Sequence, residues 1–323
     1  MIHASAPGKV VLWGEYAVLT GAPGLVLAVD RRASCTLTPG GDTWHFETRG
    51  LPEPAVDLDV ADLTGAHPPG PSGGALAWHV LRHLDSEVPA GATLTTDTAS
   101  FQDGGHKLGI GSSAAVCTAV YGAFCELLGI GPSLNDALAV HRSLQGGSGS
   151  GIDVAAAYLG GSLRYQLRGG ARPPAAEPFD LPDGLILRFI WTGTPAQTTR
   201  HVARFEAWRA ENQTSTLTEL AQASAALFES GHLVDDLAEY AERLYAMDRA
   251  AGLGIYTDAH LQLSQVAKEC KVVYKPCGAG GGDIGVAASN NEYRVERFVS
   301  AALGLGFQIV EMEKTEHGIQ LAS

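Results

Sequence analysis

The feature that most constrains this 323-residue chain is a glycine-rich stretch, residues 104–118 (Gly-Gly-His-Lys-Leu-Gly-Ile-Gly-Ser-Ser-Ala-Ala-Val-Cys-Thr). Glycines let backbone N–H groups approach an anion, and the small-residue run that follows predicts a helix whose unpaired N–H groups face the same place. Lys107 adds a positive charge, while Ser112 and Ser113 add hydroxyls able to reach a phosphate or its magnesium ion. The stretch predicts a phosphate site, although by itself it is equally typical of a plain tight turn.

Chain length and charge narrow the class of protein. The chain is longer than the roughly 250–300 residues that one hydrophobic core usually serves, so we expect two domains. A formal net charge of −13 argues against a nucleic-acid partner and against an anionic membrane, because either needs a basic face. A small anionic ligand is still compatible, since local lysines, a helix N-terminus and a metal ion can hold phosphate on an acidic protein.

Cysteine usage and hydropathy indicate the compartment. The five cysteines form no Cys-x-x-Cys pair and are odd in number, which predicts reduced structural thiols rather than a zinc site or a disulfide framework. The sequence shows neither a signal-peptide pattern at its N-terminus nor an uncharged apolar span of about 18 residues. We therefore expect a cytoplasmic protein. Its oligomeric state stays open, with a homodimer as one expected assembly.

The first half of the chain reads as a sheet followed by helices. Apolar β-rich runs separated by glycine and proline predict strands at 10–13, 25–29, 33–38, 43–48 and 92–98. Residues 51–74 are rich in Pro, Gly and Asp and predict a loop. Helical spacing or small-residue composition predicts helices at 75–84, 112–128 and 133–145.

The second half predicts a different arrangement. Residues 169–180 are rich in Gly, Pro and Ala and form the expected interdomain linker, followed by a strand at 185–191. Helix-compatible sequence covers 198–252, with breaks near 213–216 and 231. The remaining elements are a helix at 258–271, strands at 272–275 and 284–288, a helix at 293–303 and a strand at 307–311. This order favours an antiparallel sheet with helices on one face.

Four motifs follow one another along the chain. They are Ala6-Pro7-Gly8-Lys9 with Gly14-Glu15-Tyr16-Ala17-Val18, then Gly109-Ile110-Gly111-Ser112-Ser113, then Gly149-Ser150-Gly151-Ile152-Asp153, and Cys277-Gly278-Ala279-Gly280-Gly281-Gly282-Asp283. In this order they resemble the GHMP kinases, a family that includes galactokinase, homoserine kinase, mevalonate kinase and phosphomevalonate kinase. The resemblance spans nearly the whole chain. It implies an α+β fold with an N-terminal α/β domain (1–180), a C-terminal ferredoxin-like domain (181–323) and an active site in the cleft between them.

Within the family the chain is most similar to the phosphomevalonate kinases. That resemblance is carried by Lys107 ahead of the phosphate loop, by the Trp-Thr-Gly-Thr-Pro-Ala-Gln-Thr stretch at 191–198 and by residues 275–285. Two departures are visible: Cys277 stands where a serine is usual, and the loop between Gln145 and Asp153 is one residue longer than the pattern. The resemblance implies phosphoryl transfer from MgATP to (R)-5-phosphomevalonate, giving 5-diphosphomevalonate and ADP in the mevalonate route to isoprenoids.

The resemblance also implies roles for individual residues. Lys9 and Asp153 would be catalytic, with Lys9 touching the acceptor and the γ-phosphate of ATP. The remaining contacts divide by ligand. The ATP phosphates would be held by Lys107, Gly109, Gly111, Ser112 and Ser113, with Ser112 also on Mg²⁺, and the phosphorylated small-molecule substrate by Ser148, Ser150, Thr194, Lys275, Gly280 and Gly281.

The role of Asp153 and the identity of the acceptor leave alternatives. A family aspartate at this position acts as a base toward a hydroxyl, but a phosphate acceptor with a second pKa near ~6 is mostly ionised already. We therefore hypothesise that Asp153 orients Lys9 or Mg²⁺; simple helix capping is the other interpretation. The competing functions are a family kinase acting on an alcohol such as mevalonate or a sugar, and a catalytically silent ligand-binding relative, which the retained Lys9, Ser112 and Asp153 disfavour.

Overall fold

A computed structural model describes residues 1–50, 53–70, 73–147, 149–169, 172–196, 198–212 and 215–322. In the described chain the larger sheet has eight strands, with the order β14-β1-β2-β5-β3-β4 and with β8 and β9 added beside β2. All its pairings are antiparallel except that of β3 with β5. The strands are β1 (Ile2–Trp13), β2 (Gly24–Pro39), β3 (Trp44–Arg49), β4 (Val56–Leu58), β5 (Ala92–Asp97), β8 (Ser162–Gln166), β9 (Ala175–Pro178) and β14 (Gln320–Ala322).

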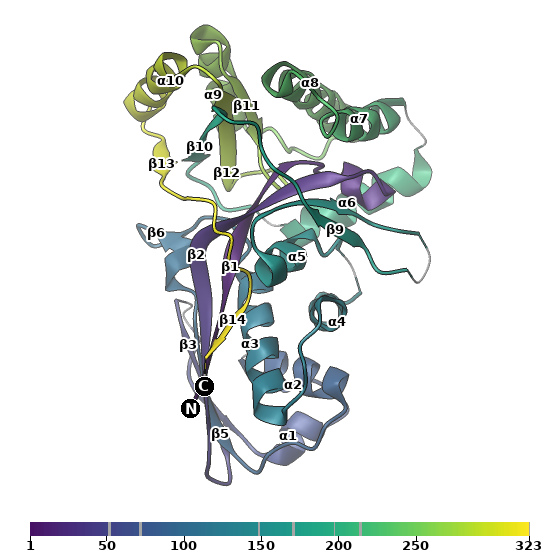
Figure 1. Ribbon diagram of the computed structural model, residues 1–323, viewed down its shortest axis with the longest axis vertical. Coiled ribbons are helices and arrows are strands. Elements are labelled where there is room, and N and C mark those ends of the chain that lie inside the picture. Colours follow the sequence, from purple (N-terminus) through teal and green to yellow (C-terminus); the bar gives the residue numbers. More distant parts are fainter. Residues whose placement is uncertain are drawn as a thin grey trace.

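Helix α3 is the central support of this sheet. Figure 1 shows α3 lying along β1 and β2, with α2 and α4 outside it. Because small residues (alanine, serine, cysteine, threonine and glycine) make up most of its sequence, strands and helices pack closely around it and most of its residues are buried. Its bounds, Ser112–Leu128, are those predicted from the sequence. The other helices of this domain are α1 (Val60–Thr64), α2 (Gly73–Leu84), α4 (Leu134–Leu144) and α5 (Ile152–Leu159).

The C-terminal domain contains the predicted antiparallel sheet, in the order β11-β12-β10-β13. One face packs against α9 and α10. The other face is also covered, because alternate β12 residues such as Val286 join the same apolar cluster as Leu237 of α8. The elements are β10 (Ile186–Trp191), α6 (Thr198–Glu211), α7 (Ser215–Ala226), α8 (Leu233–Ala251), α9 (Asp258–Cys270), β11 (Val273–Pro276), β12 (Ile284–Ser289), α10 (Glu292–Gly304) and β13 (Gln308–Val310).

Three local expectations differ from the structure. The stretch predicted as a loop at 51–74 contains β4 and α1 and the start of α2. The strands predicted at 25–29 and 33–38 form one continuous strand, β2, which follows β1 through a register shift at Pro7/Gly8. The expected linker at 169–180 contains β9, which pairs with β8. In each case pairing with another strand decided the outcome: β4 pairs with β3, β9 with β8, and the whole length of β2 with β1.

The C-terminal end of the chain returns to the first sheet. Lys314 bridges Val29, and β14 pairs with the start of β1, so the two chain ends lie together (Figure 1). The segment from 314 to 322 therefore belongs to the N-terminal sheet, although the sequence placed it in the domain 181–323. Among the described residues, no helix combines the length and the apolar character that a membrane crossing needs.

A buried ion pair joins the two domains. The side chains of Glu15, which follows β1, and Lys275, in β11, have 0% exposure, and their charged atoms lie 2.5 Å apart. The Tyr240 hydroxyl donates to the second Glu15 oxygen at 2.8 Å and accepts the Gly14 N–H at 2.8 Å. Lys275 is thus fully enclosed and does not line the cleft. The substrate contact predicted for Lys275 is replaced by a tie between domains, because a buried lysine needs a buried anion.

Replacement of Lys275 by methionine tests this tie. Lys275→Met leaves Glu15 buried without a cation, and breaking such a pair costs about 3–5 kcal/mol. We expect urea unfolding, monitored by circular dichroism, to show a decrease of this size in the free energy of unfolding. Glu15→Gln combined with Lys275→Met removes both charges and should recover most of the lost stability. Equal stability of the single variant and the wild type would contradict the assignment.

Candidate active site

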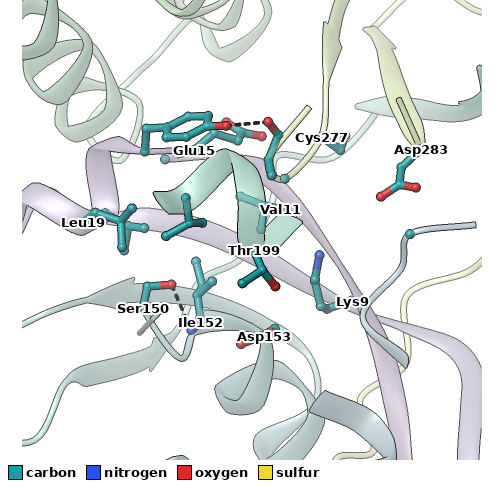
Figure 2. Close-up of a pocket in the computed structure, with 18 of the residues that line it drawn as sticks. Lys9, Val11, Glu15, Leu19, Ser150, Ile152, Asp153, Thr199, Cys277 and Asp283 are labelled. Atoms are coloured by element: carbon teal, nitrogen blue, oxygen red, sulfur yellow. Dashed lines mark hydrogen bonds between the residues drawn. The ribbon is translucent and has the colours of Figure 1, made fainter. Parts of the chain in front are cut away.

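Two cavities in the cleft between the domains share part of their lining, and Figure 2 shows the residues of the first. The first, here named the apolar cavity after the side chains of Val11, Val18, Leu19, Ile152 and Val202, is also lined by Tyr16, Cys277 and the carboxylate of Glu15. The second, named the loop cavity, is lined by Lys107, Gly111, Ser112, Ser113 and Arg200. The residues common to both linings are Lys9, Gly109, Gln145, Asp153, Thr199 and Asp283. The shared residues form the junction at which a group could pass from one cavity to the other.

The phosphate loop has the backbone predicted for an anion site. Gly109 and Gly111 have φ values of 75° and 85°, a region that side chains rarely adopt, and Gly111 is the N-cap of α3. No side chain caps that helix start, so its first N–H groups face the loop cavity together with the Ser112 side chain. Lys107 lies in the short strand β7 (His106–Lys107), paired with β6 (Gln102–Asp103), and lines the same cavity. Loop, helix start and lysine therefore converge.

Lys9 connects the strand β1 with two glycine motifs. Its backbone N–H donates to the Ile110 carbonyl at 2.8 Å, which holds the phosphate loop against β1. Its aliphatic stem crosses Gly111, where an added Cβ would stand 2.9 Å from Lys9 Cγ. Its ammonium ends 3.7 Å from the position of a Cβ on Gly278. Among the described residues, Lys9 has no carboxylate within ion-pair distance, so its charge is available at the junction.

Asp153 lies in the first turn of α5 and lines both cavities. The N-cap of this helix is Gly151, in a left-handed conformation, and no side chain caps the helix start. Asp153 Oδ1 accepts the N–H of the adjacent Val154 at 3.0 Å. The carboxylate therefore does not have the N-cap position that the capping interpretation requires. It sits half-buried at the junction, where it can orient a cation.

Asp283 is a junction residue to which the sequence assigned no role. Its φ of 55° is left-handed, and its Oδ1 accepts the Ala196 N–H at 2.8 Å. Burial raises the pKa of this carboxyl, while the Ala196 N–H, Lys9 and Lys107 act in the opposite direction. The only local signal was an acidic residue directly after Gly280-Gly281-Gly282.

The predicted acceptor contacts divide into several groups. Ser150 lines the apolar cavity, and its carbonyl accepts the Tyr165 hydroxyl at 2.5 Å. The Thr194 side chain is exposed, and its carbonyl accepts the Asp283 N–H at 2.7 Å. Gly280 and Gly281 pack against Ile255 and His201 rather than lining either cavity. The part of the third glycine motif that does line the apolar cavity is Cys277, Gly278 and Ala279. Ser148 lies outside the described residues.

Cys277 forms part of the apolar wall. Burial raises the pKa of its thiol to about 12, against the opposing effect of Lys275, so the side chain is neutral. It thereby acts as a small apolar surface with a weak S–H donor where a serine would offer a strong one. All five cysteines are free and buried, as predicted.

Helix α6 supplies residues that the sequence analysis missed. Thr199 lies at the junction, Val202 lines the apolar cavity and the exposed Arg200 lines the loop cavity. The sequence predicted only that this segment is helical. Nothing in its spacing distinguishes a cleft-facing helix from a solvated one, because the cleft is formed by packing against a domain far away in sequence.

Comparison with known proteins gives the context of this cleft. Residues 75–161 match the model of the GHMP kinases N terminal domain. The chain is 29% identical to a phosphomevalonate kinase of Streptomyces sp. (strain CL190), with 89% of each chain covered, and 28% identical to a mevalonate kinase of Aeropyrum pernix, covering 80% of this chain and 74% of that one. A solved structure of Streptococcus pneumoniae phosphomevalonate kinase, in complex with phosphomevalonate and AMPPNP, has a TM-score of 0.79 at 19% identity, covering 98% of this chain and 100% of that one.

Arg200 allows a direct test of the loop cavity. A hydrogen bond to a charged group contributes about 1.5–3 kcal/mol, so Arg200→Gln should weaken MgATP binding about 10- to 100-fold. Titration calorimetry measures the change. Arg249→Gln, on the exposed surface of α8, is the matched control and should bind MgATP as the wild type does. Unchanged affinity in Arg200→Gln would remove this residue from the nucleotide site.

Proposed function

We propose that this chain is a GHMP kinase that transfers the γ-phosphoryl group of ATP to the phosphate of (R)-5-phosphomevalonate, supported by the match of residues 75–161 to the GHMP kinases N terminal domain and by the similar phosphomevalonate kinase of Streptomyces sp.. The products are 5-diphosphomevalonate and ADP, as in the mevalonate route to isoprenoids. The observation that carries the proposal is the junction, where Lys9 lines both an apolar cavity and a glycine-rich anion cavity. A donor and an acceptor in adjacent cavities, with one cation between them, is the arrangement that phosphoryl transfer needs.

The two cavities suit the two substrates differently. The triphosphate suits the loop cavity, where the N–H groups at the start of α3 meet Lys107 and Arg200. The hydrocarbon part of the acceptor suits the apolar cavity, with its wall of valine, leucine and isoleucine side chains. The acceptor phosphate then lies at the junction beside Lys9.

The charge balance supports a phosphorylated acceptor. A second phosphate beside the γ-phosphate adds negative charge at the point of transfer, and cations must offset it. Lys9, Lys107 and Arg200 line the loop cavity together with two carboxylates, Asp153 and Asp283, so the cations outnumber the anions there on a protein whose formal net charge is −13. An alcohol acceptor would require fewer cations. The 29% identical phosphomevalonate kinase of Streptomyces sp. supports the same choice.

Magnesium fits the oxygen groups at the loop cavity. Mg²⁺ prefers oxygen ligands and is commonly bound by one or two carboxylates together with substrate phosphates. Ser112 and Asp153 line this cavity and would hold the ion there. When bound, the ion neutralises phosphate charge.

The protein's own residues then act by position and charge. An acceptor phosphate oxygen forms a bond to the γ-phosphorus while the bond to the β-phosphate oxygen breaks and ADP leaves. Lys9 stabilises the charge on the transferred group, and the N–H groups of the phosphate loop hold the rest of the triphosphate. Asp153 holds Lys9 or the metal in place and removes no proton, since the acceptor is already ionised.

The acceptor assignment is tested with purified protein and MgATP. We expect ADP release with phosphomevalonate and little with mevalonate, galactose or homoserine. A coupled assay monitors the ADP that is released. Phosphorus NMR should show a diphosphate product. Turnover with mevalonate instead would favour the alcohol kinase, whose support is the 28% identical mevalonate kinase. Nucleotide binding without turnover on any acceptor would favour a silent relative.

Asp153→Asn tests the absence of a general base. General acid–base catalysis contributes at most about 10⁴-fold. If Asp153 only orients a cation, the loss in kcat with phosphomevalonate should be well below about 10⁴-fold. Affinities for Mg²⁺ and phosphomevalonate, measured separately, show how much of the loss in activity comes from weaker binding. A loss above this limit with unchanged affinities would show that Asp153 moves a proton.

A further inference from the structure

The phosphate loop is enclosed by two side chains that arrive from different domains. The stem of Lys9, from β1, crosses the loop at Gly111. The carboxyl group of Asp283, from the turn before β12, meets it at Gly109, where an added Cβ would stand 2.0 Å from Asp283 Cγ and 2.1 Å from Oδ2. Both glycines therefore provide room for these side chains as well as a left-handed backbone.

Asp283 is held in place by several hydrogen bonds. Its N–H donates to the Thr194 carbonyl at 2.7 Å, and its own carbonyl accepts the N–H and the hydroxyl of Thr192, each at 2.9 Å. The Ala196 N–H donates to Oδ1 at 2.8 Å. A non-glycine residue in a left-handed conformation persists only where its surroundings determine it, and such residues concentrate at functional sites. The carboxyl group is thus fixed by the 192–196 segment before any ligand binds.

A carboxylate beside bound phosphates needs cations nearby. Only 9% of Asp283 is exposed, and that part lines both cavities. The charges of Lys9 and Lys107 both act on it, although neither forms an ion pair with it within 4.0 Å in the described chain. In Figure 2 Lys9 lies between Asp153 and Asp283, and its ammonium points to the Asp283 side. The Lys9 ammonium lies 3.7 Å from the position of a Cβ on Gly278, and attraction to Asp283 favours this orientation.

We propose that Asp283 is a positioning residue: it holds the phosphate loop at Gly109 and orients the Lys9 ammonium at the junction of the two cavities. This inference rests on the proposed function for the identity of the acceptor. Asp283 acts from the C-terminal domain, so the geometry of Lys9 depends on how the two domains meet. Both Lys9 and the phosphate loop belong to the N-terminal domain, yet their alignment is set by Asp283, a residue of the C-terminal domain.

The test is a double-mutant cycle between Asp283→Asn and Lys9→Met. Asparagine keeps the shape and an oxygen to accept the Ala196 N–H, and it tolerates the left-handed backbone, so it removes only the charge. A misplacement of about 1 Å can cost about 10²-fold in rate. We therefore expect Asp283→Asn to lower kcat about 10- to 100-fold with a change in KM for ATP below about threefold. In the Lys9→Met background the same change should have almost no further effect.

The cycle is measured on phosphomevalonate and also on ATP hydrolysis without acceptor. An incorrect acceptor would abolish the first activity and leave the second measurable, so the two proposals fail separately. Equal factors in both backgrounds would overturn the positioning role, because a purely structural effect is additive. Asp248→Asn is the matched control: Asp248 is also buried and accepts two backbone N–H groups, from Ile255 and Tyr256 at 2.9 Å, but lines neither cavity. It should change stability and show no coupling to Lys9.

Crystal structures provide a readout that does not depend on turnover. In the wild type we expect the Lys9 ammonium near Gly278, and in Asp283→Asn we expect it displaced from that position. An unmoved Lys9 in the variant would overturn the proposal even if activity fell.

Discussion

The active-site cleft depends on close backbone approach at the phosphate loop. Gly109 and Gly111 have no side chains, and the space that a Cβ would fill holds the carboxyl group of Asp283 and the stem of Lys9. Any larger residue would meet these atoms and would also be strained at a positive φ. The same two glycines therefore serve the start of α3, the packing of the Lys9 stem and the contact with Asp283 of the other domain. A glycine motif usually interpreted as a phosphate-binding loop therefore also packs against Lys9 and Asp283 at the junction of the two cavities.

The relation between the domains is maintained by polar contacts in a largely apolar interface. The Glu15–Lys275 pair and the Tyr240 hydroxyl are enclosed by a cluster that spans β1, β2, α8 and β12. Tyr16, whose hydroxyl donates to the Ala279 carbonyl at 2.5 Å, adds a second tie beside the apolar cavity. Buried charges are directional and intolerant of displacement, so they fix the register in which the two domains meet. The shape of the cleft depends on this relative position of the two domains.

Positive side chains gather in one part of this acidic protein. Lys9, Lys107 and Arg200 come from β1, β7 and α6, and they converge with the start of α3 on one cavity. The adjoining apolar cavity combines valine, leucine and isoleucine side chains with the Glu15 carboxylate, and Lys9 lies where the two cavities join. Asp153 and Asp283 flank Lys9 there and limit its orientation (Figure 2). Preorganised charges of this kind need no rearrangement when the reaction occurs.

The sequence by itself determined the elements whose signals are local. The bounds of α3, the cap of α4 at Ser133 and the alternation of strands and helices after residue 258 follow from glycine, serine and apolar periodicity. The four motifs indicated the GHMP kinases, whose N terminal domain model matches residues 75–161. Tertiary structure alone decided that Lys275 is buried against Glu15, that the C-terminal end joins the first sheet, and that α6 and Asp283 face the cleft. These outcomes depend on contacts between residues some 100 to 300 positions apart, such as the 260-residue separation of Glu15 and Lys275. A local pattern records the neighbours of a residue along the chain, whereas burial and charge pairing are set by neighbours in space.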